Sequence, residues 1–395
     1  MEQTSAPPVS IAETLDRLAR FEPVPHPVVS LYLDTRPDQR GRDHFWPFVR
    51  KELAARARTY APRSPEREGF DRDAERIERY LLEDLRPSAN GVALFACSGA
   101  DGFFEALQLD APIEENRLAV GDCPHLYPLA RLIDEHPRYA VLVADTRSAR
   151  LYVFGRGRTI ESDTIESEVP GRTSVRGWSQ MRYQRHVDAL QARHAKEVVE
   201  ALERTVREDR VRHVLLAGDE VIVPLLRDQL PKALEEMVVD TLRLEMRAPE
   251  HAIAQAAALA LKEHDARTDR ERVERLLDEY RSGGLGVVGP EETLAALSVG
   301  QVDELLLSST LDPAGGEGPP SGATGGPNAS DAHAPESHGE TERTGENLAN
   351  ELVRLAHQTA ARVRFIQDPS LMAELGGVGA MLRYRLEGTG LEKNP

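Results

Sequence analysis

The segment from residue 312 to residue 348 constrains the fold of this chain more than any other stretch. It consists mainly of Gly, Pro, Ser, Ala, Asn and Glu and contains the run PAGGEGPPSGATGGPNASDAHAPESHGE. A segment of this composition buries too little apolar surface to offset the conformational entropy lost on folding. We therefore expect a disordered insertion, and the domain around it must be assembled from sequence on both of its sides.

The length of 395 residues is more than one hydrophobic core usually organises, and it favours two or three domains. We expect an α/β (α+β) fold with an N-terminal α/β domain at 1–130, a middle domain at 137–282 and a C-terminal domain at 285–392. The C-terminal domain contains the insertion at 312–348. Ser282-Gly283-Gly284 follows a charged helical stretch and predicts a helix stop and hinge.

The N-terminal domain shows short runs typical of strands at 28–33 and 91–96, with helical patterns at 46–61 and 65–85. The acids and prolines at 110–124 indicate the exit from this domain.

In the middle domain, the runs 139–144 and 149–154 flank Asp145 and predict a hairpin. The pattern then predicts a flexible polar loop at 161–180, a helix at 182–207, a strand at 213–218, a helix at 223–229, a strand at 238–244 and helices at 249–264 and 267–281. This order favours a mixed sheet flanked by helices.

Composition and charge exclude several classes of protein. The net charge of −17 argues against a general nucleic-acid coat. No apolar run approaches the roughly 20 residues that span a bilayer, and the N-terminus lacks the pattern of a secretory signal. Cys97 and Cys123 form no paired motif, so we expect no zinc site. We also expect no cofactor and no membrane partner. These features predict a soluble, cytoplasmic protein.

A basic island stands out against the acidic average. Between Gly171 and Lys196 the only acid is Asp188, whereas the basic residues are Arg172, Arg176, Arg182, Arg185, Arg193 and Lys196. Such an island fits either a surface that contacts RNA phosphates or a solvated helix face whose acidic partners come from elsewhere.

The C-terminal domain carries the most specific sequence pattern. A helix at 291–297 precedes the stretch GQVDELLLS at 300–308, a helix at 351–361 precedes a strand at 363–366, and the chain closes with GGVGAMLRY at 376–384. This pattern resembles the third domain of archaeo-eukaryotic class-1 release factors and Pelota, which shares the fold of kink-turn-binding ribosomal proteins. The resemblance implies that the protein works on the ribosome.

The middle domain contains the stretch RGWSQMRYQRH at 176–186. Release factors carry a Gly-Gly-Gln loop followed by Arg-Phe-x-Arg at the start of a long helix, and residues 182–185 resemble the second element. The loop at 171–181 departs from the pattern, because Arg176, Gly177 and Trp178 stand where Gly-Gly-Gln would fall and Gln180 follows two residues later. It is closer to the looser loops of bacterial relatives and of mitochondrial peptidyl-tRNA hydrolases. The same resemblance implies an RNase H-like middle domain.

The resemblance implies roles for residues of this loop. Ester hydrolysis needs a positioned water and donors for the developing oxyanion, and a glutamine donates and accepts hydrogen bonds without titrating. Positioning alone supplies much of such a rate enhancement, so no general base is required from this chain. The candidate catalytic residues are Gly177, Ser179 and Gln180. The candidate RNA-binding residues are Arg172, Arg176, Trp178, Arg182, Tyr183 and Arg185.

The implied activity is hydrolysis of peptidyl-tRNA during ribosome rescue or quality control. The implied partners are the ribosomal A site, the peptidyl-transferase centre, the tRNA acceptor end and a translational GTPase. A non-catalytic factor that occupies the A site during hibernation or stalling, as some bacterial Pelota-like proteins do, fits the same resemblance. The N-terminal domain shows neither an Asn-Ile-Lys-Ser-like loop nor a Tyr-x-Cys motif, so we expect no stop-codon recognition.

A metal-dependent nuclease is a further alternative for an RNase H-like domain. Asp145, Asp219 and Asp240 follow or end predicted strands, where carboxylates of a metal site would lie. Acids at such places also serve as turn residues and helix caps.

Overall fold

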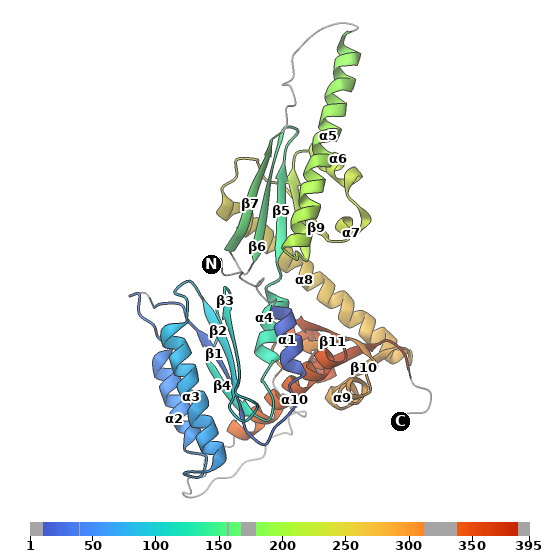
Figure 1. The fold of residues 1–395 in the computed structure, drawn as a ribbon. Helices are drawn as coiled ribbons and strands as arrows, with labels where there is room; N and C mark the ends of the chain where they lie inside the picture. The colour runs from blue at the N-terminus through green and yellow to red at the C-terminus, as the bar shows by residue number, and fades with distance from the viewer. Residues whose placement is uncertain (1–10, 39, 156–157, 167–178, 312–337, 386–395) are drawn as a thin grey trace, which may run out of the picture. The chain divides into compact units, whose positions relative to one another are not determined.

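The computed structural model describes residues 11–38, 40–155, 158–166, 179–311 and 338–385. The chain divides into two compact units, coloured along the sequence in Figure 1. Unit 1 joins the part before His136 to the part after Thr268, and unit 2 is His136–Thr268. Both units contain helices and strands, which confirms the expected α/β class.

The N-terminal part of unit 1 is built on an antiparallel sheet with strand order β3-β2-β1-β4. Its strands are β1 (Val28–Asp34), β2 (Gly91–Cys97), β3 (Phe103–Leu109) and β4 (Arg117–Gly121). Strand β4 lies inside the stretch at 110–124 that was expected to be the domain exit. This expectation was wrong because a strand of only five residues, flanked by acids and prolines, is recognised by its pairing with β1 rather than by its own pattern.

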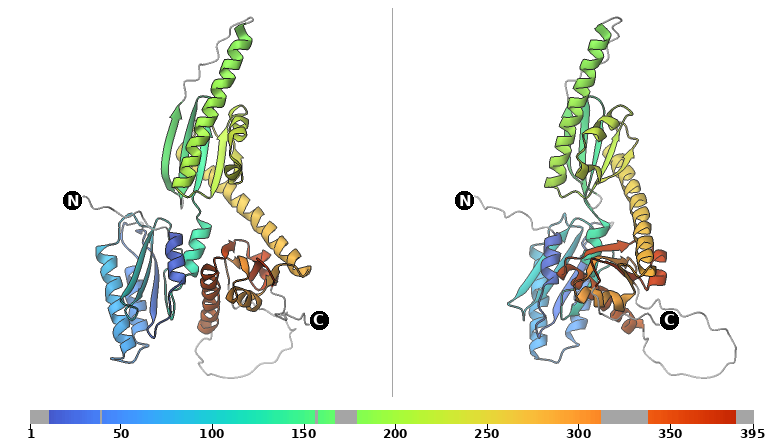
Figure 2. Two further views of the ribbon diagram at one scale, coloured as in Figure 1. Left: turned by 45° about the vertical axis from the view of Figure 1, so that its right-hand side comes forward. Right: turned by 90° about the vertical axis from the view of Figure 1, so that its right-hand side faces the viewer.

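Helices cover both faces of this sheet. On one face, α2 (Trp46–Ala57) and α3 (Pro65–Glu83) lie side by side, as Figures 1 and 2 show, and Leu53 and Phe70 pack there with Leu31 and Leu33. On the other face, Tyr32 and residues of β2 pack with α1 (Ile11–Ala19) and α4 (Tyr127–Glu135). Successive residues of a strand point to opposite faces, and because both faces are covered, β1 is buried from Val28 to Leu33.

The C-terminal part of unit 1 holds a mixed sheet with strand order β10-β13-β11-β12. Its elements are β10 (Gly286–Val288), α9 (Pro290–Ser298), β11 (Val302–Ser308), α10 (His338–Gln358), β12 (Arg362–Ile366), 3-10 turns at Pro369–Leu371 and Ala373–Leu375, and β13 (Val378–Leu382). Gly376 and Gly377 have φ of 64° and 75°, so the predicted tight turn is confirmed, and β13 becomes a central strand.

Helix α10 begins at His338, so residues 338–348 differ from the disordered insertion expected there. The Glu and Arg residues of this stretch favour helix and continue directly into the amphipathic stretch at 349–358. Residues 312–337 of the expected insertion lie outside the described residues.

The N-terminal and C-terminal parts of unit 1 share a hydrophobic core. In this core Leu15 and Leu129 belong to the same cluster as Val353 and Phe365. The side chain of Asn350 on α10 accepts a hydrogen bond from Leu126 N at 2.6 Å and donates to the Pro124 carbonyl at 3.2 Å. One side chain therefore satisfies two neighbouring backbone groups that lie 224 and 226 positions away from it in the sequence.

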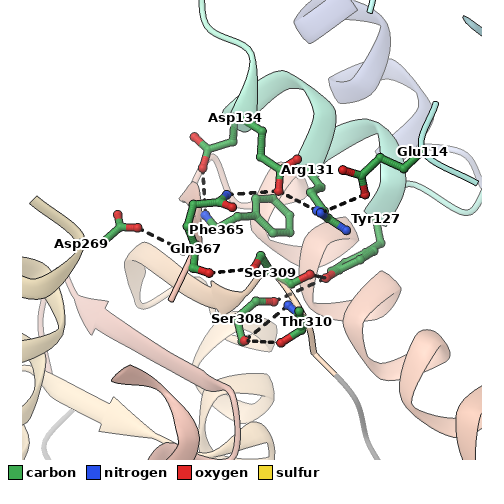
Figure 3. Close-up of polar contacts among 11 residues, drawn as sticks. Glu114, Tyr127, Arg131, Asp134, Asp269, Ser308, Ser309, Thr310, Phe365 and Gln367 are labelled. Carbon is green, nitrogen blue, oxygen red and sulfur yellow. Dashed lines mark hydrogen bonds and ion pairs between the residues drawn. The ribbon is translucent and has the colours of Figure 1, made fainter. Parts of the chain in front are cut away.

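Polar contacts around α4 tie the two parts together, as Figure 3 shows. Asp134 binds the Arg364 guanidinium at 2.8 Å and accepts a hydrogen bond from Phe365 N at 2.8 Å. The Tyr127 hydroxyl donates to the Ser309 carbonyl at 3.3 Å, and its ring meets Phe365 edge-on at 5.4 Å. The Asp134–Arg364 pair is mostly buried, so losing one partner would leave a poorly solvated charge.

His125 is buried beside this shared core and gives it a pH dependence. Burial lowers the pKa of His125 to about 4, and no described group bonds its Nε2 atom. The unfolded chain therefore binds a proton at higher pH than the folded chain, and the free energy of unfolding falls as pH drops from about 6.5 to about 4. We expect a loss of about 3 kcal/mol over this window.

Urea unfolding of the wild type and of His125→Leu at neutral pH and near pH 4 measures this contribution. We expect the variant to lose less stability on acidification than the wild type. Equal losses in both proteins would contradict the assignment to His125.

Unit 2 is a mixed sheet with strand order β7-β6-β5-β8-β9. Its strands are β5 (Tyr139–Ala144), β6 (Ser148–Gly155), β7 (Arg158–Glu166), β8 (His213–Gly218) and β9 (Val238–Leu242). Strands β7, β6 and β5 are antiparallel, whereas β5, β8 and β9 are parallel. This sheet agrees with the expected RNase H-like fold, and the predicted hairpin of β5 and β6 is confirmed.

Helices pack on both faces of the unit 2 sheet. Helices α5 (Ser179–Glu208) and α6 (Ile222–Gln229) cover one face, followed by the short α7 (Lys232–Glu235), and the start of α8 (Glu250–Arg281) covers the other. Two expectations were wrong here. Residues 161–166 belong to β7 rather than to a loop, and 249–264 and 267–281 belong to one helix, because no Gly or Pro separates them.

Gly218 marks a close approach between β8 and its neighbours. A Cβ atom at Gly218 would lie 2.5 Å from the Ala144 carbonyl oxygen and 2.7 Å from a methyl carbon of Ile222. Because the first contact is with backbone, relief requires a shift of the strand. We expect Gly218→Ala to lower the free energy of unfolding by about 1–3 kcal/mol.

The matched control is Gly121→Ala, where the nearest atom to an added Cβ is 4.0 Å away. We expect this substitution to change stability by less than about 0.5 kcal/mol. Denaturant unfolding of both variants measures the difference, and equal effects would contradict the packing argument.

Candidate functional site

Helix α5 is longer than the sheet on which it packs. Its 30 residues span about 45 Å, whereas the six residues of β5 span about 20 Å. Figures 1 and 2 show the N-terminal part of α5 running past the ends of the strands of unit 2. Its buried side chains begin, among the described ones, only at Val187. The first turns of α5 are therefore carried beyond the core of unit 2.

Five of the candidate site residues belong to this projecting end. Ser179, Gln180, Arg182 and Tyr183 stand in the first two turns of α5, and the exposed Arg185 follows them. Arg172, Arg176, Gly177 and Trp178 lie outside the described residues. The helix begins at Ser179, so Gln180 belongs to the helix rather than to the loop in which it was expected.

A helix start has chemistry that the sequence analysis missed. The first four backbone N–H groups of a helix have no partner within it, and the helix dipole places partial positive charge there. Acidic residues normally gather in such a turn, but the first turn of α5 contains none and Arg182 follows it. This combination favours an anion at the helix start. Ser179, a residue type preferred at helix starts, is the sequence signal that could have located it.

The basic island divides into two parts along α5. Arg193 pairs with Glu197 at 2.9 Å and Lys196 lies 3.9 Å from Glu200, each one helical turn away. These two cations form a solvated helix face whose acidic partners lie on the same helix, so they contribute little field at a distance. Among the described side chains of the island, the exposed Arg185 is the cation nearest the helix start.

The three aspartates of the nuclease alternative are used differently in the structure. Asp145 accepts hydrogen bonds from Arg147 N and Ser148 N, both at 2.8 Å, and shapes the β5–β6 turn. Asp219 accepts from Val221 N and Ile222 N at 2.9 Å, in the turn that leads into α6. Asp240 lies within β9 and not at its end, which corrects the expected position. Asp145 and Asp219 therefore serve as turn residues.

Within the described part of the chain, no group of three His, Cys, Asp or Glu side chains is placed to hold a metal ion. Burial raises the pKa of both the Cys97 and the Cys123 thiols, which disfavours the nucleophilic thiolate. None of the helices that the structure describes has the length and apolar character needed to cross a bilayer.

Comparison with protein families assigns the two parts of the chain that follow the N-terminal sheet. Residues 124–262 match the model of bacterial archaeo-eukaryotic release factor family 10. Residues 266–386 match the model of eRF1 domain 3. The second match covers the stretches at 300–308 and 376–384 on which the predicted resemblance rested.

Similar proteins include archaeal release factors. The chain is 29% identical to peptide chain release factor subunit 1 of Methanocaldococcus jannaschii over 48% of its own length and 47% of the relative. It is 24% identical to the same factor of Thermococcus onnurineus, over 79% and 83% of the two chains. The chain thus spans about half the length of the first of these relatives and more of the second.

Among solved structures, S. cerevisiae Dom34, a translation termination-like factor, is 13% identical over 75% of this chain and 82% of Dom34, with a TM-score of 0.43. The two family matches confirm the resemblance predicted from the loop and the C-terminal motifs. The chain therefore belongs to the bacterial archaeo-eukaryotic release factor-like proteins.

Proposed function

We propose that this protein acts in the ribosomal A site during rescue or quality control and hydrolyses peptidyl-tRNA there. The observation that carries the proposal is the long helix α5, whose first turns project beyond the sheet of unit 2 and hold Gln180, Arg182 and Arg185. A projecting, positively charged helix start is suited to reach the acceptor end of a tRNA in the peptidyl-transferase centre.

The chemistry proposed at this end needs few groups. Gln180 would position the attacking water, with Gly177 permitting close backbone approach and Ser179 adding a hydroxyl. The unpaired N–H groups of the helix start would donate hydrogen bonds to the oxyanion that develops during ester cleavage. Because the ribosome holds the ester in place, orientation supplies much of the rate enhancement.

Arginines around this end would supply affinity. Arg172, Arg176, Arg182 and Arg185 would contact phosphates of the acceptor stem, and Trp178 and Tyr183 would stack on unpaired bases. Phosphate contacts position the protein without reading sequence, so the factor would accept any tRNA. A translational GTPase is proposed as the partner that delivers it, and work on ribosomes implies a cytoplasmic location.

A purified system tests this function. Ribosomes carrying a labelled peptidyl-tRNA are mixed with the protein, and the released peptide and the ribosome-bound protein are measured separately. The proposal predicts both binding and release. Binding without release would replace hydrolysis by occupancy, and the absence of binding would contradict work on the ribosome.

Occupancy is the second candidate function because of one specific observation. In an ungapped alignment on the arginines, Arg176 and Trp178 take the places of the first glycine and of the glutamine in the Gly-Gly-Gln loop. A cation and a large aromatic ring are suited to gripping RNA rather than to positioning water. A factor of this kind would occupy the A site of an idle or stalled ribosome. Its binding to the ribosome would survive Gln180→Ala.

A further inference from the structure

A second basic region lies in unit 1, in and around helix α2. Residues 36–63 contain eight Lys and Arg residues and only three Asp and Glu residues, in a chain whose net charge is −17. The neighbouring α3, at 65–83, has the opposite balance, with seven acids and four arginines. Positive charge is thus concentrated on one of the two helices that cover this face of the sheet.

The positive charge of α2 is gathered on its exposed side. Its buried positions recur about every fourth residue at Phe45, Val49, Leu53 and Ala57, and they face the core with β1. At about 100° per residue, Arg50, Lys51 and Arg58 fall within one sector of about 100° outside the buried arc, with Lys51 and Arg58 opposite that arc and Arg50 beside it. The other exposed residues of this sector are Pro47 and Ala54.

These three cations are largely free of acidic partners. Within the described residues no carboxylate lies in ion-pair distance of Arg50 or Arg58. Lys51 lies 3.3 Å from Glu52, but its side chain is 81% exposed, so water and salt weaken this pair. The Arg50 guanidinium lies 5.6 Å above the ring of the half-buried Trp46. The face defined by Trp46, Arg50, Lys51 and Arg58 is called the α2 face below.

We propose that the α2 face binds the sugar–phosphate backbone of RNA. Cations in one sector, separated by small side chains, allow a phosphate chain to approach closely along the helix. The 12 residues of α2 span about 18 Å, which is enough for several consecutive phosphates. Trp46 beside Arg50 adds a surface on which an unpaired base can stack. Such binding is independent of base sequence.

The same face is poorly suited to other anionic partners. Protein interfaces are anchored by large buried apolar or aromatic side chains, whereas Pro47 and Ala54 offer none. Membrane-surface helices present a stripe of large apolar residues beside their cations, and the corresponding stripe of α2 is buried in unit 1. This binding goes beyond the proposed function, because it involves a different unit and requires neither a ribosome nor catalysis.

A fluorescence-anisotropy titration tests the α2 face with the full chain and a labelled oligouridylate of about 20 nucleotides at several KCl concentrations. The test variant combines Arg50→Ala, Lys51→Ala and Arg58→Ala. The control combines Arg72→Ala, Arg79→Ala and Arg275→Ala, three exposed arginines of unit 1 whose loss changes the net charge equally. Alanine favours helix at all of these positions, and circular dichroism checks the fold.

We expect the test variant to bind RNA at least about tenfold more weakly than the wild type. Its slope of log Kd against log salt should fall by about 2, since each lost phosphate contact contributes about 0.7 for a single strand. The control should stay within about twofold of the wild type in affinity. A test variant that binds as the wild type does, or a control that loses as much, would overturn the proposal.

The partner class is tested in the same titration. A polyglutamate peptide that competes as strongly as unlabelled RNA would overturn RNA as the ligand in favour of an acidic protein. Oligouridylate binding is measured with the free protein and peptide release with ribosomes, so failure of the hydrolysis proposal and failure of the α2 proposal give different results.

Discussion

Replacement of Gln180 by alanine is expected to slow peptide release from ribosome-bound peptidyl-tRNA by about 100-fold or more. This is the usual cost of removing a group that stabilises or positions the reacting atoms of an acyl transfer. The side chain would be lost at the first turn of α5, where its removal leaves the helix intact. Release is measured in single-turnover reactions with saturating protein, so that the rate reports chemistry and not binding.

Two comparisons make this prediction specific. Ribosome co-sedimentation of Gln180→Ala should equal that of the wild type, because affinity is assigned to the arginines. Gln191→Ala, on the same helix but three turns further along, should release peptide at the wild-type rate. A wild-type rate for Gln180→Ala would remove this residue from the reaction, whereas equal losses in both variants would indicate a general disturbance of α5.

Separating the two parts of unit 1 is expected to abolish folding of the C-terminal part. A fragment of residues 269–395 lacks α1 and α4, against which α10 and β12 pack. It would expose apolar surface at Val353 and Phe365, worth about 1.5–3 kcal/mol for each side chain, and replace the hydrogen bonds of Asn350 by bonds to water. These losses are comparable to the whole stability of a domain.

Thermal unfolding followed by circular dichroism compares this fragment with residues 136–268. The second fragment contains its own sheet and both flanking cores, so it should show a cooperative transition. The fragment of residues 269–395 should show none. A cooperative transition in the fragment 269–395 would show that the shared core is not required for its fold.

The sequence predicted a strand well where consecutive residues along the chain are all apolar and buried. The run at 139–144 becomes β5 with identical bounds, because six consecutive buried residues need no partner to be recognised. Strand β7 was missed for the opposite reason. Its sequence, RTIESDTIE, is mostly polar. It forms a strand because its backbone pairs with that of β6 at the edge of the sheet.

The predicted helix bounds were wrong where the amino-acid composition changes but the helix continues. The Ala-rich and the charged stretches of α8 look like two segments, yet residues 264–267 contain neither Gly nor Pro to end a helix. The composition of 312–348 likewise concealed the start of α10. The contact of Asn350 with Leu126 joins residues 224 positions apart and has no local signal at all.

The candidate site was predictable in its residues but not in its setting. The arginines and Gln180 follow from the sequence motif, whereas the projection of α5 follows from the length of the helix relative to that of its sheet. Arg193 and Lys196 were part of the same basic island and turn out to be paired one turn away on their own helix. The part of the basic island whose charge is available to an RNA phosphate is therefore shorter than the sequence suggested.

The most direct test of the proposed site is a structure of the protein on a ribosome that carries peptidyl-tRNA, obtained by cryo-electron microscopy. The measured quantity is the distance between the Gln180 side chain and the ester at the terminal adenosine of the tRNA. We expect the first turn of α5 to lie in the peptidyl-transferase centre, with this distance within about 4 Å, close enough for one bridging water. A bound protein whose α5 start lies away from the acceptor end would contradict the proposed site.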